Sequence, residues 1–93
     1  MSTDDEAARQ AHGVTDLFSH GRLTSVPRRP ARRAQLLAYL AASLFTGGRV
    51  YTEQEVNEAL ASVHDDTSAL RRYLVEEGFL GRTRDGAVYQ RLR

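Results

Sequence analysis

Cysteine and lysine are absent from the 93-residue chain. Without cysteine, the protein forms neither a disulfide nor a thiolate metal site, and nothing points to an oxidising compartment. No segment approaches the about 20 apolar residues that a membrane-spanning helix requires, and the N-terminus is acidic where an export signal would be basic. These absences predict a cytoplasmic protein without a membrane partner.

The length is that of one domain, and a chain this short buries roughly two-thirds of the surface that it exposes when unfolded. Residues 1–13 are mostly polar, and their apolar side chains are small or isolated. Such a segment lacks the apolar area that offsets the entropy of ordering. We therefore predict a disordered tail over residues 1–13 and one folded domain over residues 14–93.

The absence of lysine means that all 13 basic residues are arginine, which suits bidentate contact with carboxylates or phosphates. The net charge of +1 is unevenly distributed. Residues 22–49 contain six arginines and no acid, residues 50–77 contain two arginines and seven acids, and residues 78–93 contain four arginines and one acid. Two explanations of the arginines stay open, a binding surface and a GC-rich genome that favours arginine codons.

A first long helix is predicted from Pro30, which suits a first helical turn, to the glycine pair at 47–48. Its apolar stripe is formed by Leu37, Leu40, Ala41 and Leu44. Ahead of this helix, residues 14–18 favour a short helical turn, and residues 21–27 favour a brief extended segment.

The clearest local signal lies in YTEQEV, residues 51–56. Thr52 and Glu55 have the spacing of a capping box, in which each side chain bonds the other residue's backbone N–H. Tyr51 and Val56 flank this box at the positions of a hydrophobic staple. The sequence therefore predicts that a second helix begins directly after Thr52.

The segment DTSALRRYLVEEG, residues 66–78, is predicted to form a third helix. Asp65 or Asp66 can cap its start, and Gly78 suits a left-handed C-cap. Its buried side is formed by Leu70, Tyr73 and Leu74. Away from that side point Ser68, Arg71, Arg72 and Val75.

The last segment, residues 79–93, is predicted to be a β-hairpin with Asp85-Gly86 as its two-residue turn. In that register one face carries Phe79, Thr83, Val88 and Leu92. The other face carries Arg82, Arg84, Tyr89 and Arg91. We expect the more apolar face on the core and the arginine face outside.

The predicted order is helix, short strand, helix, tight turn, helix and hairpin, which is typical of a winged helix-turn-helix domain. We therefore predict an α+β fold, mainly helical, of the winged helix-turn-helix type. It would have a C-terminal β-hairpin wing and a short N-terminal extension.

In such a fold the third helix lies in the major groove of DNA, and the wing contacts phosphates. The DNA-binding candidates on the helix are Ser68, Arg71 and Arg72. The alternative for the two arginines is an internal salt bridge, and for Arg71 we expect its partners in the preceding helix and turn. The phosphate-binding candidates on the wing are Arg82, Arg84 and Arg91.

Four arginines, Arg28, Arg29, Arg32 and Arg33, lie at the start of the first long helix. Cations there oppose the positive end of the helix dipole unless an anion is near. A phosphate would supply that anion, which makes Arg28, Arg29 and Arg32 further DNA-binding candidates. The protein's own acidic residues would supply it equally well.

Enzymatic activity is not expected. His12, His20 and His64 are scattered and lack the spacing of metal ligands. The HDD segment at residues 64–66 imitates an acid-base cluster, but a turn that caps a helix explains it better. The chain has no glycine-rich phosphate loop and no serine in a nucleophile elbow, so we predict no catalytic residue, metal site or cofactor.

Four blocks of sequence, GRLTSVP, YTEQEVNEAL, LRRYLVEEGFLGR and DGAVY, form a specific combination. The residues that matter most in them are Gly21, Arg22, Leu23, Pro27, Tyr51, Thr52, Glu55, Val56, Asn57, Leu70, Arg71, Arg72, Leu74, Val75, Gly78, Arg82, Gly86 and Tyr89. Over roughly residues 15–92, the chain resembles a bacterial family of domains of unknown function that occurs alone or fused to ArsR-type winged-helix repressors. The resemblance implies a winged-helix fold and a role in transcription, and it carries over no catalytic or ligand residue.

The leading hypothesis is a DNA-binding transcriptional regulator of the winged-helix type, with double-stranded DNA as its partner. The alternative is a winged-helix protein-interaction module that docks on a transcription-related partner or pairs with a second copy. The acidic residues 50–77 weaken the major-groove hypothesis. A continuous positive face over the third helix and the wing would favour it.

Overall fold

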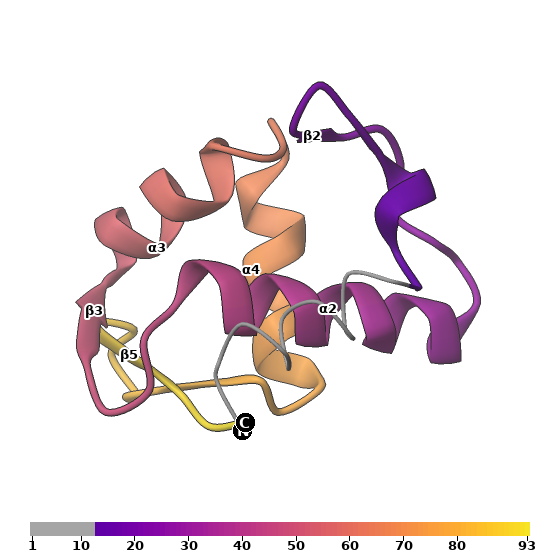
Figure 1. Cartoon of the computed structure of the whole chain (residues 1–93). Helices are drawn as coiled ribbons and strands as arrows, with labels where there is room; N and C mark the ends of the chain where they lie inside the picture. Colours follow the sequence, from indigo (N-terminus) through magenta and orange to yellow (C-terminus); the bar gives the residue numbers. More distant parts are fainter. Residues whose placement is uncertain (1–12) are drawn as a thin grey trace.

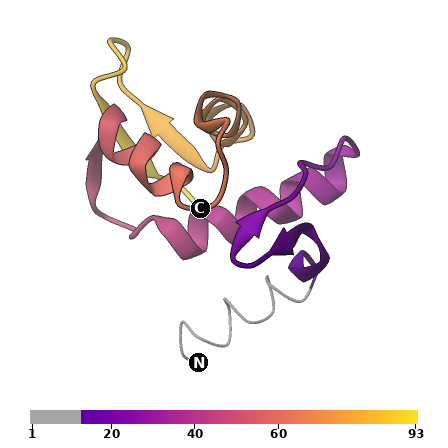
Figure 2. The same ribbon diagram turned by 90° about the horizontal axis from the view of Figure 1, so that it is seen from above.

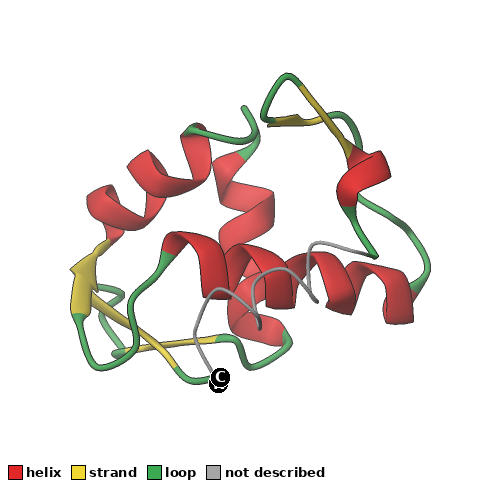
Figure 3. Cartoon of the chain, viewed as in Figure 1, coloured by secondary structure: helices red, strands yellow, loops and turns green. Residues whose placement is uncertain are grey.

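The structure, a computed structural model, describes residues 13–93, so the tail predicted for residues 1–13 lies outside the described residues except for Gly13. The elements, drawn in Figures 1 and 3, are η1 (Thr15–Leu17), β1 (Phe18–Ser19), β2 (Arg22–Leu23), α2 (Pro30–Leu44), β3 (Val50–Thr52), α3 (Glu53–Ala61), α4 (Thr67–Glu76), β4 (Leu80–Arg82) and β5 (Val88–Arg91). The predicted order of elements is confirmed from α2 onward, and η1 matches the helical turn expected at residues 14–18.

Residues 13–93 form a small α+β fold with three α-helices and two small antiparallel sheets. The expectation of a mainly helical fold is wrong, because helices occupy less than half of these residues. Residues 13–29 contribute only the short η1 and the β1–β2 hairpin, in which Phe18 pairs with Leu23. Figure 2 shows this hairpin beside α2 and the β4–β5 hairpin beside α3 and α4.

Helix α2 begins at Pro30, whose missing N–H costs nothing in a first turn. Its buried residues are Leu36, Leu37, Leu40 and Ala41. Leu44, the last residue of the predicted stripe, is only half-buried, and the following Phe45 is buried instead. The helix ends at Leu44, three residues before the glycine pair predicted to stop it.

The capping box predicted for α3 is confirmed. The Thr52 hydroxyl accepts from the N–H of Glu55 at 3.1 Å, and the Glu55 carboxylate accepts from the N–H of Thr52 at 2.9 Å. The bond from the Thr52 N–H lowers the pKa of Glu55 below its ordinary value. Tyr51 and Val56, the predicted staple pair, are both buried.

Helix α4 ends in a Schellman motif at Gly78, as its sequence predicts. Gly78 has a φ of +79°, a region that side chains with a Cβ rarely enter. The N–H of Phe79 donates to the carbonyl of Leu74 at 2.9 Å, and the N–H of Gly78 donates to that of Val75 at 3.2 Å. The motif turns the chain sharply from α4 into β4.

The second sheet has the strand order β3-β5-β4, so the last strand in sequence is the central one. Tyr89 of β5 pairs with Tyr51 on one side and with Arg82 on the other. The pairing of Arg82 with Tyr89 is the register predicted for the hairpin, which is therefore confirmed. The turn itself differs from the predicted Asp85-Gly86, because the N–H of Gly86 donates to the carbonyl of Thr83 at 2.9 Å and so places Arg84 and Asp85 at its centre.

The predicted orientation of the hairpin is wrong. Tyr89, assigned to the outer face, is only 1% exposed, whereas Val88 and Leu92, assigned to the core, are 38% and 60% exposed. Strand β3 determines which face of the hairpin packs on the core, because its Tyr51 pairs with Tyr89 and both rings are buried. Arg82 and Arg91 consequently share the core-facing side of the sheet.

The core lies where the three α-helices meet this inner face of the sheet. Its fully buried side chains include Leu36, Leu37 and Leu40 of α2, Val56 and Leu60 of α3, Leu70 and Leu74 of α4, and Tyr89 of β5. Each buried leucine contributes roughly 1.5–3 kcal/mol relative to an exposed one. This packing sets the rotation of α4 and thereby decides which of its residues face outward.

Candidate nucleic-acid interface

The position of α4 is fixed at its start by the turn that precedes it. The carboxylate of Asp66 accepts from the N–H of Ala69 at 3.1 Å, and the N–H of Asp66 donates to Nδ1 of His64 at 2.9 Å. Both contacts confirm that the HDD segment caps a helix. Because Leu70 and Leu74 are fully buried, the side of α4 opposite to them faces outward.

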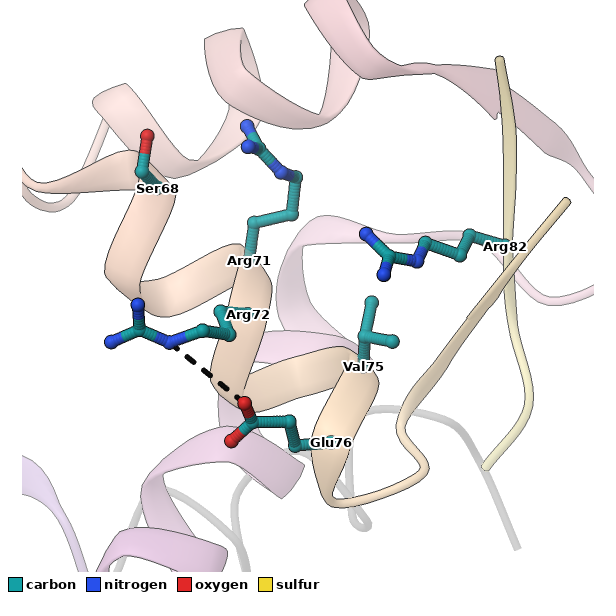
Figure 4. Close-up of a pocket in the computed structure, with 6 residues that line it drawn as sticks. All are labelled: Ser68, Arg71, Arg72, Val75, Glu76 and Arg82. Atoms are coloured by element: carbon teal, nitrogen blue, oxygen red, sulfur yellow. Dashed lines mark ion pairs between the residues drawn. The ribbon is translucent and has the colours of Figure 1, made fainter. Parts of the chain in front are cut away.

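A groove of about 340 Å³ lies between the outward side of α4 and strand β4 (Figure 4). Its lining consists of Ser68, Arg71, Arg72, Val75, Glu76 and Arg82, and we call it the α4–β4 groove. The structure thus brings together four of the predicted DNA-binding residues, from two separate elements. It does not bring the others into this lining, namely Arg28, Arg29, Arg32, Arg84 and Arg91.

Arg71 is held by α3. Its Nη1 donates to Oδ1 of Asn57, and its Nη2 lies 3.4 Å from Oε1 of Glu53, which also accepts from the Tyr89 hydroxyl at 3.4 Å. Only 20% of the Arg71 side chain is exposed. The expectation that Arg71 pairs with the preceding helix is confirmed, and its main contacts join α4 to the first and middle parts of α3.

Arg72 is far freer than its neighbour. Its Nε lies 3.9 Å from Oε1 of Glu76, one turn further along α4, and about two-thirds of the Arg72 side chain is exposed (Figure 4). An exposed pair at this spacing stabilises a helix by only about 0.2–0.5 kcal/mol. The pair therefore competes weakly with any anion that enters the groove.

Arg82 extends from β4 toward α4 in Figure 4. It is exposed, and within residues 13–93 its guanidinium forms no hydrogen bond or ion pair. Arg84, in the hairpin turn, is also exposed and has no such contact with the described residues. These two arginines keep their hydrogen-bonding capacity for a ligand.

The turn that carries Arg84 is stiffened by Asp85. Its Oδ1 accepts from the Thr83 hydroxyl at 2.6 Å and from the N–H of Ala87 at 3.0 Å. These bonds, the Thr83 contact above all, lower the pKa of Asp85 below its ordinary value. The carboxylate is thus occupied by the turn rather than by Arg84.

Arg91 takes a different direction from the other hairpin arginines. Its Nη1 donates to the carbonyl of Phe45 at 2.8 Å, and its guanidinium lies against Gly47. A Cβ at position 47 would come within 3.1 Å of Nη2 of Arg91. Half-buried Arg91 therefore ties β5 to the loop after α2, and its predicted phosphate contact stays a prediction.

The arginines at the start of α2 divide into two pairs. Arg32 is paired with Asp16, whose pKa it lowers chiefly through their hydrogen bond. Arg33 lies 3.2 Å from Glu77 and stacks over Tyr73 at 4.8 Å from the ring centroid. Arg28 and Arg29 are exposed, and their side chains form no ion pair with residues 13–93. Internal pairing, one of the two alternatives, therefore holds for two of the four.

A comparison with protein families matches residues 22–91 to a family described as an uncharacterized protein conserved in bacteria (DUF2087). The chain belongs to this family. No curated protein and no solved structure matches the chain. The family confirms the resemblance to a bacterial domain of unknown function, while the link to ArsR-type repressors stays a prediction.

Glu76 places a carboxylate in the lining, and its pair with Arg72 four residues earlier is the internal salt bridge expected as the alternative for that arginine. A second contact of the groove was not anticipated. Asn57 holds Arg71, and no sequence pattern predicts that contact because it joins two helices. Residues 13–93 contain no group of three or more potential metal ligands and no helix long and apolar enough to cross a membrane.

Proposed function

We propose that the protein is a DNA-binding transcriptional regulator of the winged helix-turn-helix type. In this proposal α3 and α4 are the helix pair, and the β4–β5 hairpin is the wing. The observation that supports it best is the α4–β4 groove, because two elements direct exposed arginines, Arg72 and Arg82, to one surface. No catalytic role is assigned.

The groove residues have distinct roles in the proposal. Arg72 and the hydroxyl of Ser68 lie on the outward side of α4, which would enter the major groove and meet base edges. Arg82 and Arg84, both on the β4–β5 hairpin, would contact phosphates beside that helix. Arg71 acts as a positioning residue, since Glu53 and Asn57 already hold its guanidinium.

Glu76 is the residue that opposes this role. Its carboxylate lies in the groove and pairs with Arg72, so DNA must displace it from that arginine. The displacement costs only a few tenths of a kcal/mol, because the pair is exposed. A bidentate contact between arginine and guanine discriminates by about 1–3 kcal/mol, which outweighs this cost.

The test is a titration of fluorescent duplex DNA of mixed sequence with the purified protein at several salt concentrations. Arg82→Ala and Arg84→Ala should each weaken binding on every sequence and reduce the slope of log affinity against log salt by about one unit. Arg72→Ala should cost about 1–3 kcal/mol on a preferred site selected from a duplex library and blunt the preference for that site.

Arg49→Ala is the matched control, because it removes the same charge from an arginine outside the groove that pairs with Glu55 at 3.1 Å. Its salt slope should stay close to that of the wild type. If the wild type shows no salt-sensitive affinity for DNA, the regulator proposal fails. If Arg49→Ala lowers the slope as much as Arg82→Ala, net charge rather than the groove drives binding.

A second candidate function, a protein-interaction module, is favoured by the outer face of the three-stranded sheet. Val50, Val88 and Leu92 are 59%, 38% and 60% exposed there. Large apolar side chains gathered on one exposed face are typical of contacts with another protein surface, including a second copy. Absence of DNA binding together with concentration-dependent self-association, lost in Leu92→Ser, would favour this candidate.

A further inference from the structure

A separate pocket of about 230 Å³ lies between the β1–β2 hairpin and the C-terminal half of α2. Phe18 on the hairpin and Tyr39 on the helix form its aromatic wall, with ring centroids 5.6 Å apart in an edge-to-face arrangement. Figure 2 shows the two elements that enclose it side by side. None of its lining residues belongs to the α4–β4 groove.

The remaining apolar lining comes from the edge of the core. Val14 and Leu40 are fully buried, and Leu44 and Val63 are half-buried and pack against the core. Core packing therefore holds these side chains in place, so the pocket exists before a ligand arrives. Preformed apolar pockets with a few polar groups are typical of small-molecule sites.

The polar groups of the lining are all neutral. Thr15, Tyr39 and Ser43 carry hydroxyls, and within residues 13–93 none of the three hydroxyls makes a hydrogen bond. No charged side chain contributes to the lining. A charged ligand would lose hydration here without gaining a counter-charge, whereas a neutral polar group would find hydroxyl partners.

We infer that this pocket binds a small neutral aromatic compound of one ring that carries a hydroxyl group. The volume is below the about 300–1,000 Å³ of drug-sized sites and above the about 150 Å³ that holds benzene, so it selects a single ring. The Phe18 and Tyr39 rings favour an aromatic occupant through edge and face contacts. The unpaired hydroxyls favour a donor or acceptor on that ring.

The pocket is connected to the turn before α4. Val63, one of its lining residues, accepts a hydrogen bond at its carbonyl from the N–H of Leu23 at 2.7 Å. Arg22 donates to the carbonyl of Ala61 at 3.0 Å and to Asp65 at 2.6 Å. A ligand in the pocket should therefore change the NMR chemical shifts of the amides of Leu23 and Val63, whether or not the protein binds DNA.

The test is an NMR titration of the 15N-labelled full chain with phenol as the neutral probe and benzoate as its charged counterpart. Phenol should produce saturable shifts at pocket amides, including Val63, with a millimolar or tighter dissociation constant. Benzoate should bind at least about tenfold more weakly, because its carboxylate has no cation in the lining.

Two filling variants test the location from opposite walls. Ser43→Phe on α2 and Thr15→Phe on η1 replace exposed lining residues, and each should weaken phenol binding at least about tenfold. Ala31→Phe is the matched control, because Ala31 is an exposed residue of α2 outside the lining. Melting temperatures of all three variants establish that they are folded.

Absence of saturable shifts up to the solubility of phenol would overturn the inference. So would unchanged phenol binding in both folded filling variants, or benzoate binding as tight as that of phenol. Because the readout is the pocket itself, these outcomes are distinguishable from a failure of the DNA titration.

Discussion

The start of α2 and the α4–β4 groove both contain closely spaced arginines, but the fold uses them differently. At the start of α2, Arg32 and Arg33 are paired with carboxylates, and Arg33 also stacks on Tyr73. In the groove, Arg82 has no carboxylate partner within residues 13–93, and Arg72 has only an exposed one at 3.9 Å. The number of arginines therefore does not measure the charge that a surface offers to a partner.

The difference follows from which residues the fold brings near each helix. The end of α4 carries Glu77 next to α2, whereas the acids of α3 are engaged elsewhere, with Glu55 in the capping box and Glu53 beside Arg71. A carboxylate within about 4 Å engages an arginine strongly when the pair is largely buried, as with Glu77 and Arg33, and only weakly when the pair is exposed, as with Glu76 and Arg72. Stability should therefore depend on the arginines in largely buried pairs, and binding on the exposed or unpaired ones.

The largest effect on stability is expected for Arg33→Ala. The pair with Glu77 is about three-quarters buried on both sides, and the stacking over Tyr73 is lost with it. The free energy of unfolding should fall by about 1–2 kcal/mol in urea denaturation. The control Arg28→Ala, on an exposed arginine of the same segment, should change it by less than about 0.5 kcal/mol. Equal losses of unfolding free energy in the two variants would contradict the distinction between arginines that are paired within the fold and arginines that are not.

A smaller effect separates two neighbours within the groove. Arg71→Ala removes the link from α4 to Asn57 and Glu53 and should lower the free energy of unfolding by about 1 kcal/mol. Arg72→Ala removes the exposed pair with Glu76 and a contact with the Tyr73 ring at 5.7 Å from its centroid, near the about 6 Å limit of cation–π attraction, and should cost about 0.5 kcal/mol. Thermal unfolding of both variants measures the difference. If Arg72→Ala is the more damaging of the two, the groove arginines are assigned the wrong way round.

The smallest effect concerns the pH dependence of the capping box at the start of α3. The carboxylate of Glu55 is held there chiefly by the backbone N–H of Thr52 and less by Arg49. The pKa of Glu55 is lowered below its ordinary value of 4.5, so its contribution is fully present above that value and is lost as the pH falls below it. The difference in melting temperature between wild type and Glu55→Gln should be largest at pH 6 and shrink steadily as the pH falls below 4.5. A difference that stays constant or grows on acidification would show that the carboxylate charge is not what the cap uses.

Much of the helical part of the fold could be predicted from local sequence. The Thr52 cap, the Asp66 cap and the Gly78 ending depend on residues within a few positions of one another, and all three are confirmed. The register of the hairpin also follows from a local turn. Local chemistry decides these features before any tertiary contact forms.

The side of the hairpin that faces the core could not be read in the same way. One face of the hairpin carries three large apolar residues, Phe79, Val88 and Leu92, and the other carries only Tyr89. A count of apolar residues within the hairpin therefore assigns the wrong face to the core. The pairing with β3, about 38 residues away in sequence, buries Tyr51 together with Tyr89 and decides the orientation. The same reversal takes Arg91 to Phe45 and leaves the outer valines exposed. The same reversal turns Arg82 to the side of the sheet that faces α4, so its position beside Ser68 and Arg72 also depends on the pairing with β3.

The strand order β3-β5-β4 also constrains how the chain can acquire its structure as it is synthesised. β3 and β4 flank the central strand without pairing with each other, so neither has a sheet partner until residues 88–91 have emerged from the ribosome. The α3–α4 pair, by contrast, joins segments that are adjacent in sequence and can dock early. A nascent chain that stops short of Val88 therefore leaves Tyr51 and Leu80 without the strand that pairs with theirs, so the three-stranded sheet is the last part of the fold to form during synthesis.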